Sequence, residues 1–86
     1  AEMGSHRKAA DDVTRVLELA PKHFASHHRR GLAWEQLNEP KLALADYDTA
    51  IRINPEYWAP FNARGYLYLS QGELDKALAD FEAAIK

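Results

Sequence analysis

The sequence predicts an all-α protein, a solenoid of antiparallel helix pairs with about five helices. One observation is composition: alanine, leucine, glutamate, lysine and arginine dominate the 86 residues, and β-branched residues are few. Such a composition favours helix throughout the chain. The other observation is an internal repeat at a constant spacing of about 34 residues, a period that is typical of helical arrays.

The repeat is visible without gaps. The run Ala43–Asp46 recurs as Ala77–Asp80, and Gly31 recurs as Gly65. Many more positions agree in the same register, so the match is not accidental. Each repeat is one unit that cannot bury its apolar face alone, and we expect neighbouring units to stack on one another.

The same register extends back to the N-terminus, where Gly4 falls at the position of Asn38 and Gly72. We therefore expect the chain to begin at the turn of an earlier repeat, although Gly4 and its neighbours could instead be a vector-derived scar. The first interpretation divides one continuous domain into three parts. They are the second helix of an incomplete repeat (residues 1–23), a complete repeat (24–57) and a repeat lacking its last residues (58–86).

Proline and glycine predict where the helices end. The first helix stops before Pro21 and the third before Pro55, because the residue preceding proline disfavours the helical conformation. Pro40 suits the first turn of the third helix, where its missing N–H costs nothing. Gly72 ends the fourth helix, since glycine tolerates positive φ. The expected helices are 5–20, 24–37, 40–53, 58–70 and 74–85.

Small and aromatic residues predict the packing. Gly31 and Gly65 lie in mid-helix although glycine costs about 1 kcal/mol there relative to alanine, so we expect the paired helix to pass close by. Ala43 and Ala77 are the small residues expected to face them. The aromatic side chains expected in the core are Trp34, Tyr47, Tyr68 and Phe81.

These residues resemble the signature of the tetratricopeptide repeat (TPR), a helix–turn–helix unit of about 34 residues. In the first repeat the matching positions are Gly31, Trp34, Ala43, Tyr47, Ala50 and Pro55, and in the next they are Phe61, Gly65, Tyr68, Ala77, Phe81 and Ala84. His27 departs from the aromatic place that Phe61 fills. The resemblance implies a right-handed solenoid whose first helices line a concave surface that holds peptide or protein segments.

Arginine stands where the family often has leucine, at Arg30 and Arg64, and an aspartate follows each at the same spacing, at Asp46 and Asp80. We predict that each arginine pairs with its aspartate inside its own repeat. A partly exposed pair of this kind contributes about 0–1 kcal/mol. The role would be structural.

The resemblance also assigns a binding groove. Its predicted lining is Ala25, His28, Arg29, Leu32, Glu35, Gln36, Ala59, Asn62, Ala63, Tyr66, Leu69 and Ser70. Tyr66 is the expected anchor, because tyrosine is enriched at binding hot spots. His28 and Arg29 make the groove locally basic on this reading.

Other function classes find little support. No serine or acid pair has a matching pocket, so the chain is expected to be non-enzymatic and to need no cofactor. His23 and His27 have the i, i+4 spacing of metal ligands, but no third ligand follows, and no metal site is expected. The net charge is −2, whereas nucleic-acid binders typically carry an excess of basic residues, so no nucleic-acid partner is expected. No apolar span or signal peptide occurs, so no membrane partner is expected, and a soluble, cytoplasmic location is the default.

A second interpretation is self-association, with a homo-oligomer formed through the solenoid ends or by helix exchange. Both end faces are expected to expose apolar side chains. The residues concerned are Val13, Val16 and Leu17 at one end and Leu78, Phe81 and Ile85 at the other.

Overall fold

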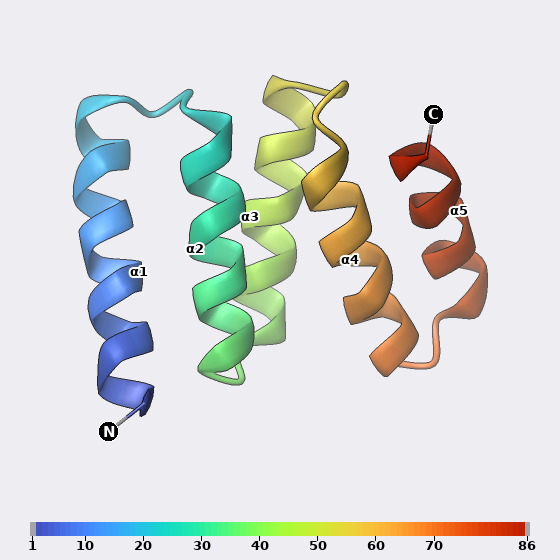
Figure 1. The fold of residues 1–86 in the computed structure, drawn as a ribbon, viewed down its shortest axis with the longest axis horizontal. Helices are drawn as coiled ribbons and strands as arrows, with labels where there is room; N and C mark the ends of the chain where they lie inside the picture. The colour runs from blue at the N-terminus through green and yellow to red at the C-terminus, as the bar shows by residue number, and fades with distance from the viewer. Residues whose placement is uncertain (1, 86) are drawn as a thin grey trace.

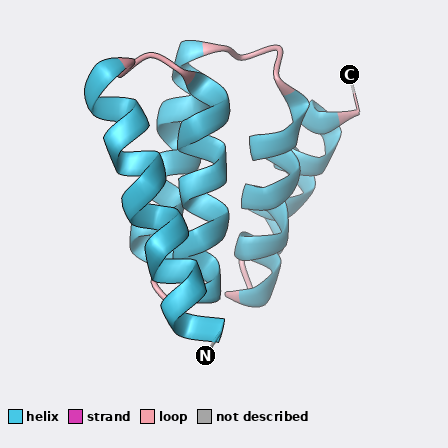
Figure 2. Ribbon diagram, turned by 60° about the vertical axis from the view of Figure 1, so that its left-hand side comes forward, coloured by secondary structure: helices cyan, strands magenta, loops and turns pink. Residues whose placement is uncertain are grey.

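A computed structural model describes residues 2–85 as five helices joined by short loops, with no strand in that range, which confirms the all-α prediction. In Figure 1 the helices follow one another along the long axis, with the two termini at opposite ends. Figure 2 shows the loops at alternating ends, so that successive helices are antiparallel. The helices are α1 (Glu2–Leu19), α2 (Phe24–Gln36), α3 (Pro40–Ile53), α4 (Trp58–Ser70) and α5 (Leu74–Ala84).

The turns repeat along with the helices. Asn38 and Gly72, one repeat apart, both have positive φ (60° and 77°) and follow the ends of α2 and α4. Pro40 occupies the start of α3 as predicted. Gly4 does not share the turn: it lies inside α1, which begins at Glu2. The turn expected at Gly4 is therefore wrong, because glycine permits a left-handed turn without requiring one.

The mid-helix glycines do mark close approaches, but the neighbour is an aromatic ring. A Cβ atom on Gly31 would overlap the ring of Tyr47, and one on Gly65 would lie 2.7 Å from Cε1 of Phe81. The nearest atoms at both positions belong to these rings and not to the predicted Ala43 and Ala77. Glycine is needed here because the facing ring occupies the space of its missing side chain.

The core lies where the two repeats meet. Ala43 and Tyr47 from α3 form a buried cluster with Leu67 from α4, and Trp34 and Ala63 pack against it. Tyr47 has no exposed surface. The second repeat is therefore held on the first by residues from both helices of the first.

Two arginines tie the helices together. Arg30 donates from Nε and Nη2 to both carboxylate oxygens of Asp46, at 2.8 Å each. Arg64 does the same to Asp80, at 2.8 and 2.7 Å. The expected partial exposure holds only for the arginines, because Asp46 and Asp80 are 5% and 4% exposed. Such bidentate pairs are stronger than ordinary surface ion pairs.

Each arginine also reaches back to the preceding helix. Arg30 Nη1 donates to Thr14 Oγ1 at 3.1 Å, and Arg64 Nη1 lies 2.6 Å from Asp48 Oδ1. Thr14 and Asp48 are one repeat apart in register, so both contacts occupy the same place in the fold. One side chain per repeat thus connects three consecutive helices.

The two end faces match the prediction only in part: Leu78 and Ile85 are exposed as expected, at 59% and 86%. Leu17 is buried at 7% exposure, and Val13 and Phe81 are half-buried, so the expectation that Leu17 is exposed is wrong. Val16 is 46% exposed, and consecutive helical residues point about 100° apart, so Val16 and Leu17 cannot both face outward in the same direction. None of the described helices is both long and apolar enough to span a bilayer.

Candidate functional site

A hollow of about 340 Å³ opens between α2 and α4, the first helices of the two repeats. On each of the two helices the lining residues lie on the face that borders the hollow, because residues three and four apart on a helix share one side. The α2 contribution is His28, Leu32 and Glu35, and the α4 contribution is Trp58, Ala59, Asn62, Ala63 and Tyr66. The lining combines apolar surface with amide, imidazole, phenol and carboxylate groups.

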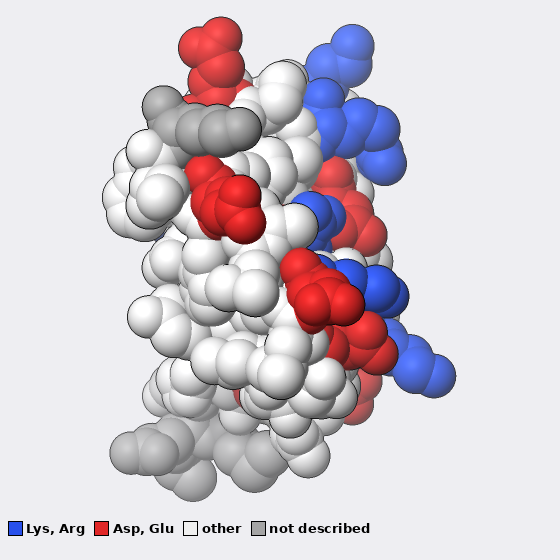
Figure 3. Space-filling model, turned by 90° about the vertical axis from the view of Figure 1, so that its right-hand side faces the viewer, with Lys and Arg blue, Asp and Glu red and all other residues white. Residues whose placement is uncertain are grey.

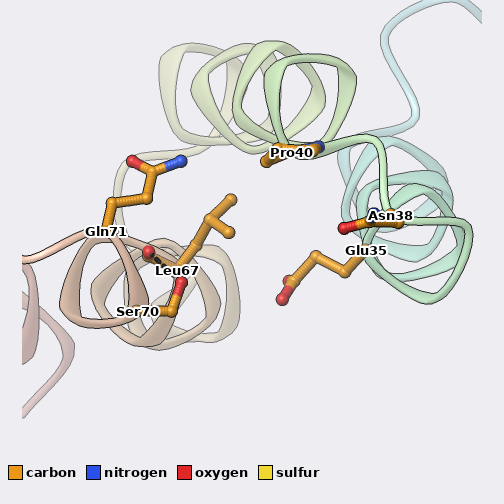
Figure 4. Close-up of a pocket in the computed structure, with 6 residues that line it drawn as sticks. All are labelled: Glu35, Asn38, Pro40, Leu67, Ser70 and Gln71. Carbon is orange, nitrogen blue, oxygen red and sulfur yellow. Dashed lines mark hydrogen bonds between the residues drawn. The ribbon is translucent and has the colours of Figure 1, made fainter.

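A second hollow of about 250 Å³ adjoins the first at the C-terminal ends of the same helices. Glu35 lines both hollows. Figure 4 shows the second hollow, with side chains from α2, the start of α3 and the end of α4 around one open space. Its lining is Glu35, Asn38, Pro40, Leu67, Ser70 and Gln71. The two hollows together are called the groove below.

Most of the lining predicted from the sequence meets in this groove. The structure brings together His28, Leu32, Glu35, Ala59, Asn62, Ala63 and Tyr66 in the first hollow and places Ser70 in the second. The other predicted residues, Ala25, Arg29, Gln36 and Leu69, line neither of these hollows. Arg29, Gln36 and Leu69 are nevertheless exposed on the same two helices.

Trp58 is a lining residue that the sequence prediction missed. Its side chain lies in the first turn of α4 and is 59% exposed. Its counterpart one repeat earlier, Phe24, is half-buried, and the ring of Tyr57 packs edge-on against it at 5.0 Å. One feature of the sequence could have indicated this residue: Trp58 is a large aromatic residue at the start of a helix that was expected to line the groove.

Glu35 owes its position to a buried tyrosine. The hydroxyl of Tyr47, on α3, donates a hydrogen bond to Oε2 of Glu35. Burial, together with the adjacent Glu35 carboxylate, raises the pKa of Tyr47 well above its ordinary value. The tyrosine therefore stays protonated and acts as the donor, which fixes the carboxylate at the edge of the groove.

His28 is packed between aromatic rings. Its ring lies 5.9 Å from that of Tyr47 and 5.7 Å from that of Tyr57. Burial lowers the pKa of His28, and the neighbouring Arg29 lowers it further. The imidazole is therefore neutral near pH 7, and the prediction of a locally basic groove is wrong for the hollow itself. Sequence alone could not show that the ring is desolvated.

The two histidines with metal-ligand spacing have other partners. His27 Nε2 donates to the carbonyl oxygen of Pro21 at 2.8 Å, and Nδ1 lies 3.4 Å from Asp46 Oδ1. His23 Nδ1 lies 2.6 Å from Ser26 Oγ. Among the side chains that the structure describes, those of residues 4–85, no group of three histidine, cysteine or acidic residues is arranged to hold a metal ion.

Two family models match the sequence, and both describe the tetratricopeptide repeat. One matches residues 24–57 and the other residues 46–79, so together they span the first repeat and most of the second. The first match coincides with α2, α3 and the loop that leads to α4. No curated protein sequence matches the chain.

Solved structures of MamA have the same fold. One superimposes with a TM-score of 0.89 at 23% identity over 94% of this chain and 47% of that one. A second, MamA MSR-1, gives 0.83 at 25% identity over 93% and 46%, and a third, MamA AMB-1, gives 0.83 at 24% identity over 93% and 47%. The chain thus spans about half the length of these MamA structures, and the likeness concerns the fold.

Proposed function

Because this chain belongs to the tetratricopeptide-repeat family, we propose that it is a non-catalytic interaction module that binds an extended peptide or protein segment in the groove between α2 and α4. Proteins of this family bind protein partners, and their repeats are generally not enzymes. The proposal assigns this binding to a specific face of this chain.

The exposed apolar side chains of the groove carry the proposal. Leu32, Trp58 and Tyr66 are 42%, 59% and 59% exposed, and all three line the same hollow. Large apolar groups gathered in a concave place are typical of interaction sites. Asn62 lies among them and offers both a donor and an acceptor, which match the N–H and C=O groups of a peptide backbone.

Peptide selection tests this proposal. Peptides selected on the wild-type protein from a random phage-displayed library are synthesised, and their affinities are measured by fluorescence anisotropy. We expect the double variant Asn62→Ala/Tyr66→Ala to bind at least roughly tenfold more weakly, since truncated hot-spot residues cost this much or more. The matched control, Leu74→Gln/Leu78→Gln on α5, should bind as wild type. Equal binding by the groove variant and the wild type would remove the groove as the site.

Self-association is the second candidate, and the C-terminal face favours it. Leu74 and Leu78 are each 59% exposed, and Ile85 is 86% exposed. Figure 3 views this end of the molecule: most charged side chains gather along one edge, a few acidic side chains lie at the top and in the upper middle, and the rest of the face is largely uncharged. An uncharged face of this kind can be covered by a second copy of the chain.

Sedimentation velocity at several concentrations tests this second candidate. An apparent mass that rises with concentration in the wild type and is constant in Leu74→Gln/Leu78→Gln would support it. A monomer at every concentration would contradict it and leave the groove as the single candidate.

A further inference from the structure

The charge of the groove is concentrated in one residue. Glu35 is the one carboxylate among the residues that line the two hollows, and none of those residues is lysine or arginine. His28, the other titratable group beside it on α2, is held neutral by its burial. Arg29 lies six residues before Glu35 on the exposed surface, about 9 Å away along the helix. A ligand in the groove therefore meets negative charge at Glu35.

The Glu35 carboxylate is held in place and only partly used. Its Oε2 accepts the hydrogen bond from Tyr47, whose side chain is completely buried and cannot move aside without disturbing the core. Among the side chains of residues 4–85, none hydrogen-bonds to Oε1. Figure 4 shows the carboxylate of Glu35 pointing into the open space of the second hollow. The Glu35 carboxylate is thus held in a fixed position, and its second oxygen can accept a hydrogen bond from a charged donor.

Apolar surface lies within one helical turn of this acceptor. Leu32 precedes Glu35 by three residues on α2, and Ala63 faces it from α4 across the first hollow. A cationic side chain that lies along this surface can place its methylene groups on the apolar lining and its charged head on the carboxylate. Charge complementarity and the shape of the lining therefore favour the same class of ligand.

On the basis of the groove function proposed above, we infer that the ligand is an extended peptide segment that places one lysine or arginine on Glu35. The same segment places an apolar or aromatic side chain in the hollow formed by Leu32, Trp58 and Tyr66. Alternate side chains of an extended chain are about 6.5 Å apart, somewhat more than one helical turn. An apolar side chain of the ligand that contacts Leu32, three residues from Glu35 on α2, therefore lies about two residues from the cationic side chain.

The experiment uses peptides selected from a random phage-displayed library on the wild-type protein. Sequences of the selected peptides are scored for lysine and arginine, and the best peptide is synthesised with its cationic residue intact and replaced by norleucine. Affinities are measured with wild type, Glu35→Gln and the exposed control Glu18→Gln on α1. Glutamine at position 35 can still accept the Tyr47 hydrogen bond, so this variant removes the charge and leaves the packing. The norleucine peptide removes the positive charge from the ligand and so tests the same contact without any change to the protein.

The inference predicts three results. Lysine or arginine is enriched two positions away from an apolar residue. The norleucine peptide and the Glu35→Gln variant each lose roughly tenfold in affinity, as expected for one charge-assisted hydrogen bond. The two changes together lose no more than one alone, and Glu18→Gln has no effect.

Two results would overturn it. Peptides that depend on Asn62 and Tyr66 but bind Glu35→Gln as tightly as wild type would refute the cation contact and leave the groove proposal standing. Peptides that bind equally to Asn62→Ala/Tyr66→Ala would refute the groove itself, and the cation contact with it.

Discussion

The first repeat (α2 and α3) and the second (α4 and α5) have the same helix–turn–helix backbone, but different side-chain contacts join the two helices of each repeat. Both press an aromatic ring of the second helix onto a glycine of the first. In the first repeat that ring is Tyr47, whose hydroxyl bonds Glu35. In the second it is Phe81, and the residue in the register place of Glu35 is Leu69. The hydroxyl and its acid are present together in the first repeat and absent together in the second, so we expect the two residues to act as one unit.

The buried aspartates differ in the same way. Asp46 faces both Arg30 and His27, with His27 Nδ1 3.4 Å from Oδ1. Asp80 faces Arg64, which also contacts Asp48, and Phe61 replaces the histidine. The Arg64 guanidinium lies 5.8 Å from the ring of Phe61. In the first repeat, therefore, one acid, Asp46, has two partners, Arg30 and His27. In the second repeat one cation, Arg64, has two acidic partners, Asp80 and Asp48.

The largest expected effect comes from neutralising these aspartates. Asp46→Asn should lower the free energy of unfolding by about 2–4 kcal/mol, because it removes the buried negative partner of the half-buried Arg30. Asp80→Asn should cost about 1–2 kcal/mol, because Arg64 keeps Asp48. Urea denaturation followed by circular dichroism measures both. Equal losses would show that the contact with Asp48 does not compensate.

A smaller effect tests whether Tyr47 and Glu35 are a unit. Tyr47→Phe should cost about 1–2 kcal/mol, because a hydrogen bond to a carboxylate is lost. The double variant Tyr47→Phe/Glu35→Leu, which copies the second repeat, should recover most of that loss. A double-mutant cycle measures the coupling. As a control, Gln36→Leu combined with Tyr47→Phe should show simple additivity; additive losses for the Glu35 pair as well would contradict the unit.

The sequence predicted the helices well because their ends depend on local chemistry. Pro40 starts α3 and Gly72 follows α4 as predicted, since proline and glycine act through their own backbone. Most of the residues that the register assigned to the groove line the two hollows, and their role in binding stays a prediction. The exposure of Trp58, the burial of Leu17 and the neutrality of His28 were missed. Each depends on side chains brought together from different helices, which no local pattern specifies.

The smallest expected effect concerns His28, whose register counterpart in the second repeat is Asn62, a residue that does not titrate. The pKa of His28 is lowered in the folded state by burial and by Arg29, whereas an unfolded histidine titrates near 6.5. Below about pH 6.5 the unfolded chain therefore binds more protons at this site, and stability falls as the pH falls toward the lowered folded pKa. The variant His28→Asn makes the first repeat copy the second and removes this contribution. The free energy of unfolding measured between pH 7.5 and 5.5 should thus fall further in the wild type than in His28→Asn, while the other histidines cancel in the comparison. Parallel curves would show that His28 titrates alike in both states, and a steeper fall in the variant would show that its pKa is raised on folding.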